Sequence, residues 1–550
     1  MKKFFIAFLM LAAMEGFSQN PEKSFRVEHT YINIPIESAQ ERQRVHFKVN
    51  GEVYTFNDIR VAKRKIDYWT FVNVEKYMGE TFTLEFSEEV PGIEKIFQSD
   101  QIEGRVPVYQ EDLRPQIHFT TKRGWNNDPN GLVYYEGEYH LFYQHNPYEI
   151  NWGNMTWGHA VSRDLLHWEE LPNAIEPDEM GTIFSGSAVI DYENTSGFKK
   201  GDQDPLVAVY TVDTWNEKQQ QCIAYSLDKV RTFFKFEENP VIPAKRRFGS
   251  GHERDPKVFW YEPANHWVLV MHDALNFSIY TSKNLKDWEY QSSVEEGFWE
   301  CPELFELPVD GNPDHTKWVM YGVTGIYLIG EFDGKTFTPE TDMLRYNIDG
   351  MTAAQTYNNV PDGRRLQIGW AHAEYPGMPF KQTFTVVQEF TLRTTPDGIR
   401  LFVNPAEELE ELHVRSHRFE NEYIGLDLNE KLFRIDSPLL HIKATFQIEN
   451  ALMFGLDING YRLTYHVPNN KLNDVFLPLR DQQLDLEVIV DKTLIEVYAD
   501  GGLVYWFEDH HESNPDDFSI SVIQSSNGLN PEPKTLVKNL EIHELKSIWE

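Results

Sequence analysis

An acidic residue held in a rigid local structure is the feature of this chain best suited to chemistry. Asp128 stands in the run Trp125-Asn126-Asn127-Asp128-Pro129-Asn130-Gly131, which strand-like runs at 132–135 and 139–144 follow. Proline fixes its own φ and Asn-Gly tolerates positive φ, so Asp-Pro-Asn-Gly predicts a tight turn. Asp128 is then presented at the mouth of a sheet, beside amides and an indole that bind hydroxyl groups. This suits a carboxylate nucleophile acting on a sugar, and the alternative is a solvated surface turn.

Two further motifs place a carboxylate next to a proline at the start of a predicted strand. They are Arg254-Asp255-Pro256 and Trp299-Glu300-Cys301-Pro302. Each has a simpler interpretation when taken alone, because Arg254 and Asp255 could form an ordinary ion pair and Glu300 could be a surface acid. In a β-propeller, however, the first strands of successive blades line one axis. Three such motifs therefore predict that Asp128, Asp255 and Glu300 converge there as catalytic residues.

A faint internal repeat supports a propeller. The run 162–168 (Ser-Arg-Asp-Leu-Leu-His-Trp) is echoed at 282–288 (Ser-Lys-Asn-Leu-Lys-Asp-Trp), with weaker variants at 226–234 and 330–337. Each copy combines a strand, a polar turn and an aromatic residue that opens the next strand. The copies lie roughly 50–65 residues apart, which is typical of four-stranded blades. Chance recurrence of such turns is the alternative, but two nearly identical copies favour a five-bladed propeller over residues 109–404.

The remaining segments also read as β structure. Residues 19–108 contain short alternating runs that predict a small β-sandwich-like domain ahead of the propeller. Residues 405–550 predict a second β-sandwich, which begins with a short connecting helix over 405–413. The expected fold is therefore all-β, with a propeller between two smaller β-domains.

Composition and charge narrow the possible partners. The formal net charge is −35 and the isoelectric point is about 4.9, which argues against nucleic acid and anionic membranes and suggests a neutral substrate. Aromatic residues make up 14% of the chain, which fits stacking on sugars, although β-rich domains are commonly aromatic-rich. The two cysteines, Cys222 and Cys301, are expected to be free, buried and on neighbouring blades. No metal-ligand spacing occurs, so no metal or other cofactor is expected.

The first eighteen residues resemble a secretory signal. Lys2 and Lys3 precede an apolar run over 4–13, and a small-residue cleavage site falls near Ser18/Gln19. The apolar run is too short for a permanent membrane anchor. We therefore expect a soluble, exported protein, periplasmic or extracellular, without membrane insertion.

The three motifs together resemble glycoside hydrolase family 32, which contains the invertases, inulinases and levanases. The family blocks appear here in their usual order as WNNDPNG, RDP and ECP, and the resemblance covers about residues 110–550. It implies a five-bladed propeller followed by a β-sandwich, and a retaining hydrolase. Asp128 would be the nucleophile and Glu300 the acid/base, while Asp255, assisted by Arg254, would hold the fructose ring and stabilise the transition state.

The resemblance also implies a sugar pocket and a substrate class. The substrate-binding residues would be Trp125, Asn127, Gln144, Trp152, Phe184, Ser185, Arg254 and Trp370. The implied function is exo-acting hydrolysis of levan, inulin or sucrose. The alternatives are a fructosyltransferase, in which a sugar hydroxyl replaces water, and a non-catalytic fructan-binding propeller. A further alternative is the arabinan- and xylan-cleaving propeller family, which shares the architecture, but its motifs do not include WNDPNG with ECP.

Overall fold

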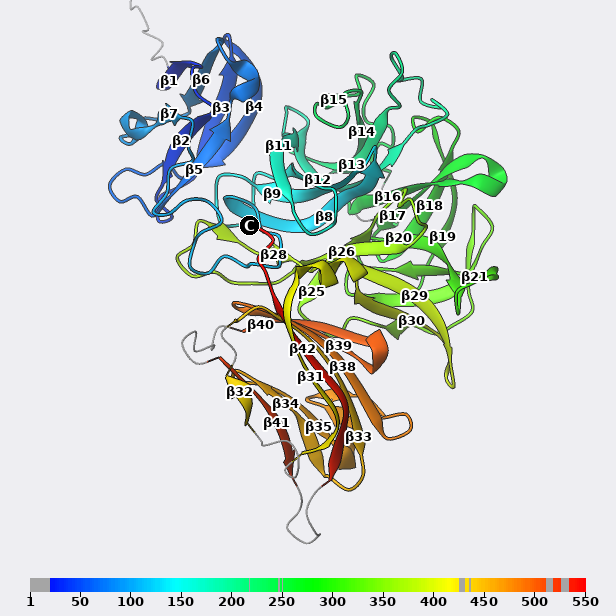
Figure 1. Ribbon diagram of the computed structural model, residues 1–550. Coiled ribbons are helices and arrows are strands. Elements are labelled where there is room, and N and C mark those ends of the chain that lie inside the picture. The colour runs from blue at the N-terminus through cyan, green and yellow to red at the C-terminus, as the bar shows by residue number, and fades with distance from the viewer. Residues whose placement is uncertain are drawn as a thin grey trace, which may run out of the picture. The chain divides into compact units, whose positions relative to one another are not determined.

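The structure is a computed structural model that describes residues 20–216, 218–245, 248–249, 251–424, 437–510, 518–525 and 534–550, together with the backbone of 431–434. The predicted signal segment lies outside the described residues. The chain divides into two compact units, of which the first contains residues 20–67 and 72–101. Figure 1 shows that strands dominate both units.

The N-terminal region forms two small sheets. One has the order β1(Glu22–Arg26)-β6(Thr81–Phe86)-β3(Gln43–Val49)-β4(Glu52–Ile59), and the other β5(Tyr68–Asn73)-β2(Tyr31–Ile36)-β7(Phe97–Ser99). Burial alternates along β3, where Val45 and Phe47 are buried and the intervening His46 is half-exposed. This period of two explains why the segment forms half-buried strands.

Five blades make up the propeller. Blade I contains β8(Gly124–Tyr135), β9(Glu138–Asn146), β10(Thr156–Ser162) and β11(Glu169–Ile175), and blade II contains β12(Gly181–Ile190), β13(Leu206–Thr214), β14(Gln219–Ser226) and β15(Phe234–Lys235). Blade III contains β16(Glu253–Tyr261), β17(His266–Asp273), β18(Asn276–Ser282) and β19(Trp288–Val294), and blade IV contains β20(Glu303–Val309), β21(Asn312–Tyr321), β22(Ile326–Phe332) and β23(Phe337–Pro339). Blade V contains β25(Met351–Thr356), β26(Arg365–Ala371), β29(Gln388–Thr395) and β30(Gly398–Pro405). Short strands β24(Leu344–Arg345), β27(Phe380–Lys381) and β28(Thr383–Phe384) join them. The predicted propeller is confirmed.

The ring closes where the end of the propeller meets its beginning. Strand β27 pairs in parallel with β8, with Phe380 opposite Gly124. Neighbouring blades share buried apolar side chains, such as Val207 and Val209 of β13, which pack in one cluster with Leu269 of β17. Burial of this kind of surface stabilises a fold by about 25 cal/mol per Å².

The sequence repeat marks one recurring turn. Ser162, Ser226 and Ser282 each end the third strand of a blade, and each hydroxyl bonds an acid or amide two residues on. This local hydrogen bond gives the chain a turn before the outer strand begins. The repeat is therefore structural, as the spacing predicts.

The C-terminal region is a two-sheet sandwich that follows a 3₁₀ helix, η4(Glu407–Leu412), as predicted (Figure 1). One sheet has the order β31(His413–Tyr423)-β42(Thr535–Leu545)-β33(Leu440–Ile448)-β38(Gln483–Asp491)-β39(Leu494–Ala499)-β40(Val504–Asp509). The other has the order β32(Lys431–Arg434)-β41(Ser519–Ser525)-β34(Met453–Ile458)-β35(Tyr461–His466)-β36(Lys471–Leu472)-β37(Val475–Phe476).

A buried histidine links the propeller to this sandwich. The Nδ1 atom of His118 lies 3.0 Å from a carboxylate oxygen of Asp491, and its Nε2 atom lies 2.8 Å from one of Glu496. Burial lowers the pKa of His118, but the two carboxylates outweigh burial and raise it to about 9. The imidazolium therefore gives both buried acids one shared cationic partner at neutral pH.

Replacing His118 with Ala should lower the melting temperature strongly. The change leaves two buried carboxylates without their shared cation, and such a loss costs about 3–5 kcal/mol. Because the folded-state pKa of about 9 exceeds the ordinary 6.5, the stabilisation by His118 is complete below pH about 6.5 and is lost as pH rises through about 9. Thermal unfolding across this window measures both effects. The control His167→Ala removes a partly exposed pair with Asp164 and should cost less than about 1 kcal/mol; equal losses would contradict the assignment.

Candidate active site

The first strand of each blade is irregular near its beginning. The pairing register shifts at 126–129 in β8, at 183–186 in β12, at 254–257 in β16 and at 352–355 in β25. Ahead of β20, Glu300 and Cys301 have φ of +44° and +46°. A bulge re-aims the side chains that it contains. Register shifts in four inner strands, and positive φ just ahead of the fifth, therefore turn several polar side chains toward one place.

The structure corrects one expectation about Asp128. The Asp-Pro-Asn-Gly run was expected to form a turn before a strand, whereas it lies inside β8 and spans two register shifts against β9, at 126–129 and at 130–133. Gly131 still uses the predicted positive φ, +55°, but within the bulged strand. An added Cβ there would lie 2.8 Å from the ring of Phe142, so close packing also requires glycine.

A chain of hydrogen bonds holds Asp128. The hydroxyl of Ser185 donates to Oδ2 at 2.5 Å, and the side-chain amide of Asn127 donates to Oδ1 at 3.1 Å. The indole Nε1 of Trp125 in turn donates to Oδ1 of Asn127 at 2.9 Å. Burial raises the pKa of Asp128, while the bonds from Ser185 and Asn127 oppose that rise. These donors favour the ionised, nucleophilic form.

Asp255 is held in a strained backbone position beside Asp128. Its φ is +60°, a conformation that costs a non-glycine residue about 1–3 kcal/mol and is concentrated at functional sites. Its backbone N–H donates to Oγ1 of Thr211 at 3.0 Å, and the N–H of Cys301 donates to its Oδ2 at 3.2 Å. Burial, with the charges of Asp128 and Glu300, raises the pKa of Asp255 to about 7, although Arg254 opposes the rise.

Arg254 and Cys301 connect the three acids. The Arg254 guanidinium pairs with Glu300 and has its Nε 3.6 Å from Oδ2 of Asp255. The thiol sulfur of Cys301 lies 3.8 Å from Oδ2 of Asp128 and 3.7 Å from Oδ2 of Asp255. Residues from blades I, III and IV thus meet at one end of the inner strands.

Two aromatic residues adjoin the groups that hold Asp128, since Trp125 bonds Asn127 and Phe184 precedes Ser185 in the chain. The rings of Trp125 and Trp370 meet edge to face at 6.0 Å, as do those of Trp152 and Phe184. Trp152 is 54% exposed. Such rings stack on the apolar faces of sugars. Gln144, which was expected to bind the substrate, is buried in β9 and pairs with Trp157 of β10. Strand β9 is the neighbour of β8, which carries Asp128.

Several supporting residues could not be identified from the sequence. Thr211 of β13 receives the Asp255 N–H bond, and Gln219 of β14 accepts a bond from Nη1 of Arg254 at 3.3 Å. Neither belongs to a motif. Trp299 precedes Glu300 in the Trp-Glu-Cys-Pro motif, and the Arg254 guanidinium lies 5.7 Å from the centre of the Trp299 ring. Packing between neighbouring blades, rather than pairing within one sheet, brings Thr211 and Gln219 to Asp255 and Arg254.

The cysteine predictions are partly wrong. Both thiols are free, as expected, and Cys222 is buried in β14. Cys301 is only half-buried, because it occupies the polar space between Asp128 and Asp255. The two lie on blades II and IV rather than on neighbouring blades, since a complete blade, β16–β19, intervenes.

Replacing Ser185 with Ala should move the acid limb of the kcat/KM pH profile to higher pH. The lost bond normally lowers the pKa of Asp128, and a bond to a charged group contributes about 1.5–3 kcal/mol, so kcat/KM at low pH should fall about tenfold or more. Ser187→Ala is the control, because that hydroxyl donates to the carbonyl of Pro256. An acid limb unchanged by the Ser185 substitution would contradict this role.

The fold and the cluster define a glycoside hydrolase with a β-propeller catalytic domain. Residues 118–405 match the model of the glycosyl hydrolases family 32 N-terminal domain. The chain is 40% identical over 496 residues to a levanase of Bacillus subtilis, covering 80% of this chain and 72% of that one. It is 32% identical over 483 residues to an extracellular exo-inulinase of Aspergillus niger, covering 72% and 88% of the two chains.

Solved structures agree with these relatives. The crystal structure of an exo-inulinase from Aspergillus awamori has a TM-score of 0.69 and 29% identity, and covers 80% of this chain and all of that one (100%). The chain belongs to glycoside hydrolase family 32. It is a β-fructosidase, and its substrate is a carbohydrate. Among the described residues, no helix is both long and apolar enough to cross a membrane.

Proposed function

We propose that this protein is an exported, retaining exo-β-fructosidase that removes terminal fructosyl units from levan or inulin and from sucrose. The observation that carries the proposal is the cluster in which Asp128, supported by Ser185 and Asn127, faces the Arg254-linked acids Asp255 and Glu300. Relatives named levanase and exo-inulinase support the fructan substrate, and the name of the extracellular inulinase supports export.

In the first step, Glu300 donates a proton to the leaving oxygen while Asp128 attacks the anomeric carbon. The bond to the leaving group breaks as the fructosyl–Asp128 ester forms, through an oxocarbenium-like transition state. Asp255 holds the ring hydroxyls and stabilises the developing positive charge. A retaining pair requires the Asp128 and Glu300 carboxyl groups to be about 5–5.5 Å apart.

In the second step, Glu300 acts as a base. It takes a proton from water, which attacks the anomeric carbon and releases Asp128 as a carboxylate. The structure contains a contact between Arg254 and Glu300, and a guanidinium in this place would stabilise the carboxylate that acts as the base. Arg254 must release this contact, or share it, when Glu300 binds its next proton.

The pocket around these acids would bind a single fructosyl ring. Trp125, Trp152, Phe184 and Trp370 supply aromatic faces and edges, and Asn127, Gln144, Ser185 and Arg254 supply polar groups. This combination of apolar rings with a few placed polar groups is typical of ligand sites. No cofactor takes part in the proposed reaction.

Product analysis tests the proposal. Thin-layer chromatography of digests of levan, inulin and sucrose should show free fructose from the earliest time points. Short oligomers released from levan would indicate endo action, and products longer than sucrose would indicate a fructosyltransferase. Absence of any product from all three would favour a non-catalytic fructan-binding propeller. The same digests will show whether β-2,6 or β-2,1 linkages are preferred.

A further inference from the structure

A second cavity lies further along the inner strands that carry the acids. Its volume is about 500 Å³, within the range of about 300–1,000 Å³ that is usual for ligand pockets. Its lining includes Ile190 of β12, Phe259 of β16 and Phe305 of β20. These residues follow Ser185, Asp255 and Glu300 by four or five positions, or roughly 13–17 Å along a strand. The cavity therefore opens toward the end of the propeller axis opposite the acids.

A buried polar plug separates this cavity from the active site. The ammonium of Lys257 lies 3.0 Å from a carboxylate oxygen of Glu303 and donates to the carbonyl of Thr356 at 2.7 Å. Glu303 lines the space beside the catalytic acids, whereas Lys257 lines the second cavity. Both side chains are at most 2% exposed. The second cavity is therefore a separate site rather than an exit channel.

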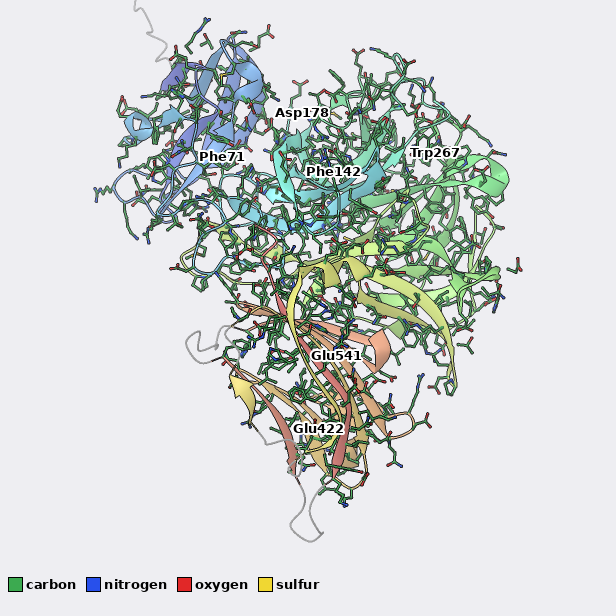
Figure 2. The ribbon with its side chains drawn as sticks, viewed as in Figure 1. Phe71, Phe142, Asp178, Trp267, Glu422 and Glu541 are labelled. Carbon is green, nitrogen blue, oxygen red and sulfur yellow. The ribbon has the colours of Figure 1, made fainter. Side chains whose placement is uncertain are left out.

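The walls of the cavity are rich in aromatic rings. Tyr192, which is 55% exposed, and half-buried Trp260 lie toward its mouth. Trp267 of β17, labelled in Figure 2, packs edge to face on Trp260 at 5.0 Å, and its indole N–H donates to Thr195. Rings braced in this way present fixed faces, as stacking on a sugar requires.

Polar groups beside these rings suit hydroxyl groups rather than anions. Glu193, Glu262 and Glu306 are exposed lining residues, so the mouth is negatively charged. Arg365 also lines the cavity, and its buried Nε has no hydrogen-bond partner among the described residues. This atom is closed to solvent, so the groups that a ligand would meet are the rings and the exposed carboxylates, which accept hydrogen bonds from hydroxyl groups. A neutral, polyhydroxylated ligand fits this combination, and a phosphate or acidic polymer does not.

We propose that this cavity is a non-catalytic binding site for a second segment of fructan. The inference rests on the proposed fructan substrate. A fructan polymer bound in this cavity could place one of its chain ends in the active site at the other end of the propeller axis. This second contact raises the effective concentration of chain ends at the active site without any new catalytic contact. The site should therefore favour polymers over sucrose.

Binding by an inactive protein tests this site directly. Full-length Asp128→Ala protein would be titrated with levan and with inulin by calorimetry, in the presence of enough fructose to fill the active site. Residual fructan binding should weaken about tenfold in Asp128→Ala/Trp260→Ala and in Asp128→Ala/Tyr192→Ala, as expected for loss of one stacking ring. Phe234→Ala in the same background is the matched control, because Phe234 is a 52% exposed aromatic outside the cavity.

Activity supplies an independent readout. With Asp128 intact, Tyr192→Ala should lower kcat/KM on levan or inulin and leave kcat/KM on sucrose unchanged. Fructan binding that survives both substitutions, or equal binding of dextran as a different neutral glucan, would overturn the proposal. If the wild-type enzyme hydrolysed neither levan nor inulin, the proposed function would be wrong. The binding titration would still show separately whether the second cavity binds fructan.

Discussion

Replacing Asp128 with Ala should reduce hydrolysis of sucrose and fructan by on the order of 10⁴-fold or more, because no covalent intermediate can then form. Activated aryl fructosides should lose activity to a similar extent, since better leaving groups do not replace a missing nucleophile. Stopped assays of free fructose measure the loss. The melting temperature serves as the control, and it should not fall by an amount that explains inactivity, because the substitution removes a desolvated carboxylate.

Added azide sharpens this prediction. A small anion in the space left by Asp128 could at most attack the anomeric carbon directly, which inverts its configuration. A retained fructosyl azide from Asp128→Ala would mean that another residue forms the intermediate. In that event Asp255, the other carboxylate held next to Cys301, would have to be reconsidered.

Replacing Glu300 with Ala should have an effect that depends on the leaving group. Fructan and sucrose have poor leaving groups, so their hydrolysis should fall by several orders of magnitude without proton donation. An activated aryl fructoside needs little protonation, so its first step should lose much less. Pre-steady-state release of the aryl group, compared with steady-state turnover, separates the two steps.

Azide should rescue this variant. The anion can occupy the space of the missing carboxylate, near Arg254, and attack the fructosyl–Asp128 ester without base help. The product should be a fructosyl azide of retained configuration. The control Glu296→Ala removes an exposed acid from the same loop and should behave like the wild type. No rescue, combined with equal losses on aryl fructoside and sucrose, would show that Glu300 is not the acid/base.

The acid motifs and the turn repeat could be predicted because both are local in sequence. The hydroxyl of Ser162 and the side chain two residues on make their hydrogen bond whatever the rest of the fold does. The conformation around Asp128 could not be predicted in the same way. Its bulge depends on the register against β9, a partner strand that the turn-forming residues do not encode.

The supporting residues depend on contacts between blades. Thr211 and Gln219 reach Asp255 and Arg254 only because blade II packs against blade III. The second cavity likewise exists only where the ends of several inner strands meet. The residue spacing within one motif carries no information about contacts between different blades. The sequence therefore indicated the acids but not the residues and the cavity around them.

The stereochemistry of the first product tests the central claim most directly. Proton NMR during hydrolysis of a β-fructofuranoside by the wild-type enzyme would identify the anomer of fructose before it equilibrates in water. Attack by Asp128 followed by attack by water inverts the anomeric carbon twice, so β-fructofuranose should appear first. Initial release of the α-anomer would mean a single displacement by water, and would contradict Asp128 as nucleophile.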